Sequence, residues 1–200
     1  APAIGTGATM DYLGQTGRDA LKGADIIKAA PEQYTSTIEY ADNGIAKYLR
    51  DVARVHTANL GTQIFYTAHG PFDTHFNQPP MHARLWTEVS SAISDFFDDL
   101  REHDAADNLV MMIFTEFGRR VRDNGTGTDH GAGGGAFIIG DNVKGGMYGT
   151  YPSLKPEDLN QGDLDPNYDF RGFYSSVIDQ WLGLDPVPIV GGQFEQVQFV

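Results

Sequence analysis

The stretch TQIFYTAHGPFDTHFNQ, residues 62–78, joins an apolar run to a polar loop. Residues 62–68 are rich in β-branched and aromatic side chains, which is typical of a β-strand. Asp73 and His75 follow just after the point where this strand is expected to end. A packed core has no need of an aspartate and a histidine two residues apart, whereas a metal ion or a polar substrate would bind them. The stretch therefore predicts a buried strand whose end carries functional side chains.

Three helices are expected over residues 31–61, 80–103 and 169–183. Apolar residues recur every three or four positions over residues 38–55, and the same period returns over residues 80–103. Pro31 suits the first turn of the first of these helices. A third helix is expected over residues 169–183, a run with an aspartate at its start and a glycine at its end. The helix over residues 80–103 has one buried apolar stripe.

Two further strands complete the expected fold. LVMMIFT, residues 109–115, is an uninterrupted apolar run, which is typical of strands covered on both faces. GAFIIG, residues 135–140, lies between glycines and predicts a third strand. Because strand 62–68, a helix and strand 109–115 follow one another with short connections, the two strands are expected to be parallel. The sequence thus predicts a single α/β domain over residues 1–200, with a largely parallel sheet flanked by helices.

The composition excludes several classes of protein. The 200 residues carry a formal net charge of −13, so nucleic-acid binding through a basic surface is not expected. There is no cysteine, which excludes disulfides and thiolate metal ligands. The sequence contains no run of about 18 apolar residues, so no transmembrane helix is expected. On such an acidic chain, an anionic ligand needs a local cluster of metal ions or arginines to hold it.

Polar side chains gather next to the three expected strands. In a parallel α/β sheet, ligands bind outside the carboxyl ends of the strands. Aspartate, glutamate and histidine are ligands for Zn²⁺, Mn²⁺ or Mg²⁺, and arginine can clamp a phosphate or sulfate group through two hydrogen bonds. The candidate residues are His69, Asp73, His75, Glu116, Arg119, Arg120, Asp129 and His130.

Structural explanations compete with the functional one at most of these positions. Asp73 and His75 also suit a turn held by aspartate hydrogen bonds. Glu116 also suits an ion pair with a neighbouring arginine, and His69 suits a turn before Gly70–Pro71. The pair formed by residues 129–130, in a glycine-rich loop, is the strongest candidate for ligand or catalytic duty, because glycines let the backbone approach a ligand closely.

Four blocks of the sequence form a recognisable set: FDTHFNQ (residues 72–78), TEFGRR (115–120), NGTGTDHGAGGGAFIIGDNVKGG (124–146) and DFRGFYSSVIDQWLGLD (169–185). Together they resemble the DUF1501 family, whose members are usually exported bacterial proteins related to the alkaline phosphatase and sulfatase superfamily. The resemblance implies an alkaline-phosphatase-like core with a metal site at the strand ends, of which this chain resembles the C-terminal half. It also implies a periplasmic or exported location.

The resemblance also implies roles for individual residues. Asp73 and His75 match an Asp/His pair on one metal, and Glu116 stands where the superfamily often has an Asp-His pair. His130 resembles the later metal-binding histidine, and Asp129 either assists it or belongs to a second metal. The superfamily takes its nucleophile from an N-terminal half, and residues 1–30 show no such half.

The expected function is that of a metal-dependent phosphate or sulfate ester hydrolase module. The metal, of which Zn²⁺, Mn²⁺, Mg²⁺ and Ca²⁺ are candidates, would be held by Asp73, His75, Glu116, Asp129 and His130. Arg119 would hold the anionic group of a small ester. A second chain, the missing half or metal-activated water would supply the nucleophile. The alternative is a non-catalytic envelope protein that binds sulfated or phosphorylated glycans or a partner protein, and a purely structural role for the polar residues stays open.

Overall fold

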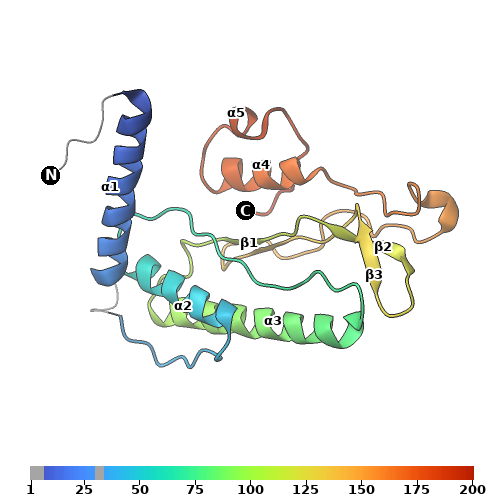
Figure 1. The fold of residues 1–200 in the computed structure, drawn as a ribbon, viewed down its shortest axis with the longest axis horizontal. Coiled ribbons are helices and arrows are strands. Elements are labelled where there is room, and N and C mark those ends of the chain that lie inside the picture. The colour runs from blue at the N-terminus through green and yellow to red at the C-terminus, as the bar shows by residue number, and fades with distance from the viewer. Residues whose placement is uncertain (1–6, 30–33) are drawn as a thin grey trace. The chain divides into compact units, whose positions relative to one another are not determined.

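The structure is a computed structural model that describes residues 7–29 and 34–200, which form two compact units (Figure 1). The units comprise Ala1–His69 with Thr87–Ala105, and Gly70–Trp86 with Ala106–Val200. Helix α3 (Gln78–Glu102) contributes residues to both units. The organisation into a single domain stays a prediction.

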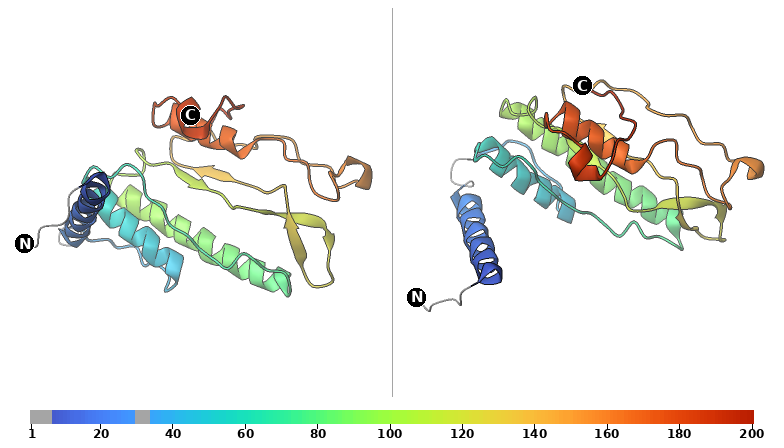
Figure 2. Two further views of the ribbon diagram at one scale, coloured as in Figure 1. Left: turned by 45° about the horizontal axis from the view of Figure 1, so that its top comes forward. Right: turned by 90° about the horizontal axis from the view of Figure 1, so that it is seen from above.

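The first unit is helical. It contains α1 (Ala8–Ala29), α2 (Gly44–Thr57) and the larger part of α3. Helix α2 begins at Gly44 because the Asn43 side chain accepts a hydrogen bond from the backbone N–H of Ala46 at 2.9 Å. Helix α2 lies beside α3 in both ribbon figures (Figures 1 and 2). The buried apolar side chains on these two helices in the first unit are Ile45, Ala46, Leu49, Ala53, Val89, Ala92, Phe96, Phe97 and Leu100.

The helix predicted over residues 80–103 is confirmed by α3, but the helix predicted from Pro31 begins too early. Pro31 itself lies outside the described residues, and residues 34–41 are not helical. Half-buried and exposed residues alternate from Tyr34 to Tyr40, which is the period of an extended chain. Ile38 fits both this alternation and the helical spacing. Because the sequence pattern counts it as part of the helix, the predicted start of the helix is wrong.

The fully buried Asp99 ties this extended segment to α3. Its Oδ2 accepts hydrogen bonds from the Tyr34 hydroxyl and, at 2.7 Å, from the Tyr40 hydroxyl. Burial and the Asp99 carboxylate raise the pKa of Tyr34 to about 12 and also raise the pKa of Tyr40, so both hydroxyls keep their protons. His103 stacks on Tyr34, and its Nδ1 and Nε2 lie 2.8 and 2.9 Å from the carbonyl oxygens of Asp99 and Thr35. Because carbonyl oxygens only accept, His103 makes both bonds as the imidazolium.

These contacts predict a pH-dependent contribution of His103 to stability. The hydrogen bond to the Asp99 backbone is the main cause that raises the pKa of His103 in the folded protein. The contribution is therefore complete below the unfolded-state value and is lost as pH rises through the higher folded-state value. We expect the loss in unfolding free energy caused by His103→Gln to be larger at about pH 5.5 than at about pH 9. These two pH values lie below and above the usual range of histidine pKa values. Urea unfolding followed by far-UV circular dichroism measures this, and an equal loss at both pH values would contradict it.

The second unit contains two small antiparallel sheets in the part of the chain that the structure describes. Strand β1 (Met111–Ile113) pairs with β4 (Phe137–Ile139), and β2 (Gly118–Asp123) pairs with β3 (Thr128–Gly131). The predicted α/β fold, a largely parallel sheet flanked by helices with an alkaline-phosphatase-like core, is therefore wrong. The β2–β3 hairpin reverses the chain between β1 and β4, so β4 returns antiparallel to β1. The apolar runs locate β1 and β4 correctly, but a run of residues carries no information about the direction of its partner.

The strand predicted over residues 62–68 does not form. No backbone hydrogen bond joins these residues to any other described residue. Ile64 and Tyr66 are 74% and 80% exposed, whereas Phe65 lies edge-on to the His56 ring in the first unit. The segment has the composition of a strand, but a strand also needs a neighbour to pair with.

The C-terminal tail docks on α4 (Phe170–Gln180), which confirms the helix predicted over residues 169–183. The buried Ser176 hydroxyl accepts a hydrogen bond from the Val197 N–H at 2.9 Å, and the Gln180 side chain bonds the backbone of Val197 and Phe199. The remaining elements are the 3-10 helix η2 (Pro156–Asp158) and α5 (Val187–Val190). Among the helices described, none is long and apolar enough to cross a membrane.

Candidate functional site

The candidate site lies in the second unit, where residues 70–78 meet the turn of the β2–β3 hairpin. Asn124 closes this turn, because its backbone N–H donates to the carbonyl of Gly127 and its side-chain oxygen accepts from the Gly127 N–H, both at 2.9 Å. The Asn124 side-chain nitrogen also donates to the carbonyl of His75 at 3.0 Å. A Cβ at Gly127 would lie 2.6 Å from that same carbonyl oxygen, so only glycine allows the two loops to approach this closely.

Three side chains converge on one point at this junction. Oδ1 of Asp73 lies 2.8 Å from Nε2 of His75 and 2.7 Å from Nε2 of His130. The two Nε2 atoms lie 3.2 Å apart. These are three potential metal-ligand atoms within 4.8 Å of one another, and all three residues are exposed. The cluster is therefore open to solvent and to any ligand that solvent carries.

Asp129 orients His75 through Nδ1, the ring nitrogen that does not face the cluster. Its Oδ1 lies 3.2 Å from Nδ1 of His75 and 3.3 Å from the Asn124 side-chain nitrogen. A carboxylate only accepts, so Nδ1 of His75 carries the proton and donates it to Asp129. Nε2 of His75 faces the cluster, 2.8 Å from Oδ1 of Asp73, and would release its proton to bind a metal ion, with the other proton kept on Nδ1 by Asp129. This carboxylate–histidine arrangement is the usual support for a metal-binding imidazole.

The histidines lower the pKa of both carboxylates. The hydrogen bond from His130 is the largest cause that holds the pKa of Asp73 below its usual value, against a smaller desolvation effect. For Asp129, the hydrogen bond from His75 is the largest cause and the one from Asn124 is the next. Both carboxylates therefore stay ionised to lower pH than ordinary aspartates, which preserves negative charge for a cation.

Phe117 and Arg119 hold His130 in place. The Phe117 ring stacks on the His130 ring with a centroid distance of 3.8 Å and an angle of 9°. The Arg119 guanidinium lies over Phe117 at 5.1 Å from the ring centroid. Its two terminal nitrogens donate to the carbonyls of Thr128 and Phe72, both at 2.7 Å. Arg119 thus clamps the hairpin to the neighbouring loop, while its predicted contact with an anionic group stays a prediction.

The remaining candidate residues lie elsewhere. Glu116 is exposed and does not belong to the cluster of three, so its role as a metal ligand stays a prediction. Arg120 pairs with Asp163 at 3.5 Å, and His69 pairs with Glu88 at 3.2 Å in the first unit. The predicted residues that the structure brings together are Asp73, His75, Asp129 and His130, with Arg119 beside them.

Phe117, Asn124 and the hairpin itself are not predicted from the sequence. One signal was present: Asn124–Gly125 lies between two polar segments, and Asn-Gly is a strong hairpin signal. The flanking residues lack the apolar alternation that usually accompanies this signal. The stacking of Phe117 on His130 has no counterpart in the sequence pattern.

Comparison with known proteins places the chain in a family. A family model described as "Protein of unknown function (DUF1501)" matches residues 24–186, which include every residue of the candidate site. No curated protein matches the chain, and no solved structure does. Because the match covers more than half of the 200 residues, the chain belongs to the DUF1501 family.

Proposed function

We propose that the second unit holds one divalent metal ion through Asp73, His75 and His130, and that the chain is a metal-dependent hydrolase of phosphate or sulfate esters. The observation that carries the proposal is the convergence of one carboxylate oxygen and two imidazole nitrogens within 4.8 Å. The relation to alkaline phosphatases and sulfatases and export from the cytoplasm stay predictions, and neither is needed for this proposal.

The donor set fits a divalent ion. Ligand atoms about 2.0–2.2 Å from a metal ion stand about 2.8–3.1 Å from one another at octahedral angles and about 3.3–3.6 Å at tetrahedral angles, so binding would separate the closest pairs by a few tenths of an ångström. The three observed separations are 2.7, 2.8 and 3.2 Å. Two imidazoles and one carboxylate suit Zn²⁺, Mn²⁺ or Fe²⁺ better than Ca²⁺, which prefers six to eight oxygens. Three protein ligands also leave coordination positions open, as a catalytic site requires.

The residues of the chain have separate tasks in this proposal. A bound divalent ion would supply Lewis-acid stabilisation of the negative charge that develops during ester hydrolysis. Asp129 keeps the proton of His75 on Nδ1, and Phe117 keeps His130 facing the cluster. Arg119 is the residue proposed to hold the anionic group, and Arg120 is the alternative, since it lies near enough to Asp129 to help lower its pKa.

The test is the metal content of the purified protein. The chain is stripped with a chelator and reloaded separately with Zn²⁺, Mn²⁺ and Mg²⁺, and elemental mass spectrometry counts the ions that remain after desalting. One equivalent per chain supports the metal centre. No retained metal at any of the three loadings would refute it.

Hydrolysis is tested separately from metal binding. The loaded protein is screened with aryl phosphate and aryl sulfate esters, with the stripped protein as control. Metal-dependent turnover supports the hydrolase. Retained metal without turnover supports the second candidate, a module that binds sulfated or phosphorylated glycans without cleaving them, which the solvent exposure of the cluster favours. Equilibrium binding of a sulfated glycan to the loaded protein then tests that candidate.

Asp129→Asn is expected to weaken metal binding by about 10- to 100-fold, the usual loss when a supporting partner of a metal ligand is changed. The amide cannot hold His75 in one orientation, because it offers both a donor and an acceptor. Competition with a fluorescent zinc chelator measures the affinity. Asp123→Asn is the matched control, since Asp123 lies in the same hairpin but accepts from Gly125 and not from a histidine. Equal affinities for Asp129→Asn and wild type would contradict the supporting role.

A further inference from the structure

The sequence contains the tripeptide Asp-Asn-Gly twice, at residues 42–44 and at residues 123–125. An asparagine that precedes glycine is prone to lose its side-chain amide, because glycine has no side chain to shield the backbone nitrogen that attacks it. Residues 42–44 lie at the start of α2, whereas residues 123–125 lie at the turn of the β2–β3 hairpin. Because the two tripeptides are identical, a difference in their reactivity comes from the folded structure.

The hairpin surrounds Asn124 with groups that promote the loss of its amide. The Gly125 N–H donates to the Asp123 carboxylate at 2.6 Å, and a carboxylate in this position can act as a general base toward that proton. The backbone N–H groups of Thr126 and Gly127 donate to Oδ1 of Asn124 at 3.3 and 2.9 Å. Such donors stabilise the negative charge that develops on a carbonyl oxygen when its carbon is attacked. Asn124 and Gly125 are also exposed, so water reaches them.

The tripeptide at residues 42–44 has a different environment. The Asp42 carboxylate forms an ion pair with Lys47 at 2.6 Å, and among the described residues it accepts no hydrogen bond from the Gly44 N–H. Oδ1 of Asn43 accepts from the Ala46 N–H, which begins α2. Cyclisation of Asn43 would therefore break the cap of a helix. Residues 42–44 are a matched internal control for residues 123–125.

We propose that Asn124 is a site of spontaneous deamidation, and that this modification removes the support of the metal cluster. The Gly125 nitrogen forms a bond to the side-chain carbonyl carbon of Asn124, and the bond from that carbon to Nδ2 breaks. The Gly125 amide proton passes to the departing nitrogen, which leaves as ammonia. Water then opens the cyclic imide at either of its carbonyls and gives aspartate or isoaspartate.

The product cannot make the contacts of the asparagine. The Asn124 side-chain nitrogen donates to the His75 carbonyl at 3.0 Å and to Oδ1 of Asp129 at 3.3 Å. A carboxylate only accepts, so both hydrogen bonds are lost and two like charges face each other. Isoaspartate also adds a carbon to the backbone of the turn. Asp129 then loses a contact beside the histidine that it orients. The effect on metal binding rests on the proposed metal centre, whereas the modification itself does not.

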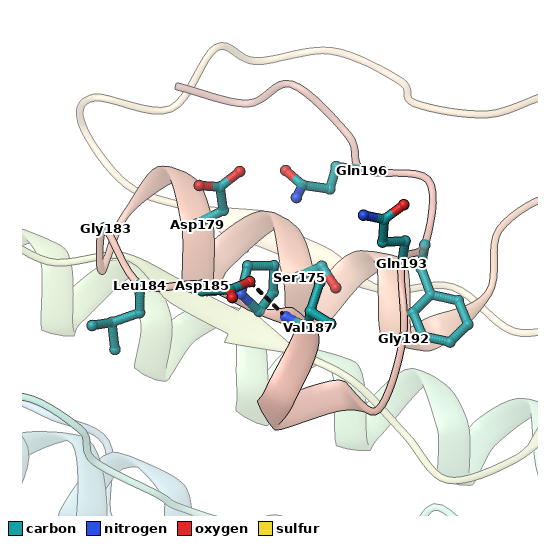
Figure 3. Close-up of a pocket in the computed structure, with 11 residues that line it drawn as sticks. Ser175, Asp179, Gly183, Leu184, Asp185, Val187, Gly192, Gln193 and Gln196 are labelled. Carbon is teal, nitrogen blue, oxygen red and sulfur yellow. Dashed lines mark hydrogen bonds between the residues drawn. The ribbon is translucent and has the colours of Figure 1, made fainter.

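The modification is measured by ageing the full chain in a metal-free, mildly alkaline buffer, followed by digestion and mass spectrometry of the peptides. We expect Asn124 to convert at least about tenfold faster than Asn43. Gln193 is the reference for an exposed amide that does not precede glycine; it lines a cavity of about 580 Å³ between α4, α5 and the C-terminal tail (Figure 3). A rate at Asn124 equal to or below the rate at Asn43 would overturn the proposal.

Two further measurements assign the difference to the fold. In concentrated urea the two asparagines are expected to convert at similar rates, and a preference for Asn124 that persists there would refute the structural cause. In the folded chain, Asp123→Asn should slow the conversion of Asn124 at least about tenfold, because it removes the carboxylate that accepts from Gly125. The rate at Asn43 should not change. An unchanged rate at Asn124 would refute the promoting role of Asp123.

The consequence is tested with Asn124→Asp, which imitates one product. We expect it to bind zinc about 10- to 100-fold more weakly than wild type, as when a supporting partner of a metal ligand is changed. Asn43→Asp is the control, because it adds the same charge in the first unit and aspartate also caps a helix. Equal zinc affinities of the two variants would overturn the effect on the cluster. A wild-type chain that binds no zinc would refute the metal centre and this effect, while the peptide measurement still decides the modification.

Discussion

Substituting alanine for His130 is expected to lower the affinity for Zn²⁺ by at least about 100-fold, more than the loss expected from a supporting residue. The substitution removes one of the three ligand atoms that converge on the site. It also removes the ring that Phe117 covers, so no other side chain is held in the same place. Metal content after desalting and competition with a zinc chelator both measure the effect.

The matched control for this experiment is His82→Ala. His82 also lies in the second unit and is exposed, but its Nε2 accepts from the Trp86 indole and takes no part in the cluster. Both variants lose one imidazole, so any general binding of zinc to surface histidines is removed from the comparison. Fluorescence of the two tryptophans, Trp86 and Trp181, reports whether the second unit remains folded. Wild-type affinity in a folded His130→Ala protein would exclude His130 as a ligand.

Gly118→Ala is expected to destabilise the second unit by about 3 kcal/mol, the upper end for overpacking a tight contact. Gly118 is buried at the start of β2, and a Cβ there would overlap the backbone carbonyl of Gly133. Backbone atoms cannot rotate away as a side chain does, so the hairpin must separate from the glycine-rich loop. Because Arg119 directly follows Gly118, the shift also reaches the contacts by which Arg119 clamps the hairpin to the neighbouring loop.

The unfolding midpoint in urea, followed by tryptophan fluorescence, measures this loss. Gly135→Ala is the control, because it lies in the same glycine-rich loop but a Cβ there meets no atom within 4 Å. We expect Gly135→Ala to stay within about 0.5 kcal/mol of wild type, as substitutions in open positions do. An equal effect of the two variants would show that loss of glycine flexibility, and not the contact with Gly133, decides the result.

Features that depend on neighbours along the chain could be predicted from the sequence. The spacing of apolar residues located α3, the aspartate and glycine at its ends located α4, and the apolar runs located β1 and β4 within a few residues. These features follow from the local geometry of the backbone, whose periods of 3.6 and 2 are written into any short window. The residue types and their places in the sequence also predicted Asp73, His75 and His130 as candidate metal ligands, and this role stays a prediction.

The way these pieces combine is set by contacts in three dimensions. The tertiary structure made β1 and β4 antiparallel, left residues 62–68 without a partner, and placed the β2–β3 hairpin where a loop was expected. It also separated the roles of neighbours, since Asp129 supports His75 while Glu116 lies outside the cluster. The physical reason is that pairing, convergence and hydrogen-bond partners depend on contacts between residues far apart in the chain. The Nε2 atoms of His75 and His130 lie 3.2 Å apart although the residues are 55 positions apart in the sequence. A pattern within a short window of sequence cannot predict such a contact.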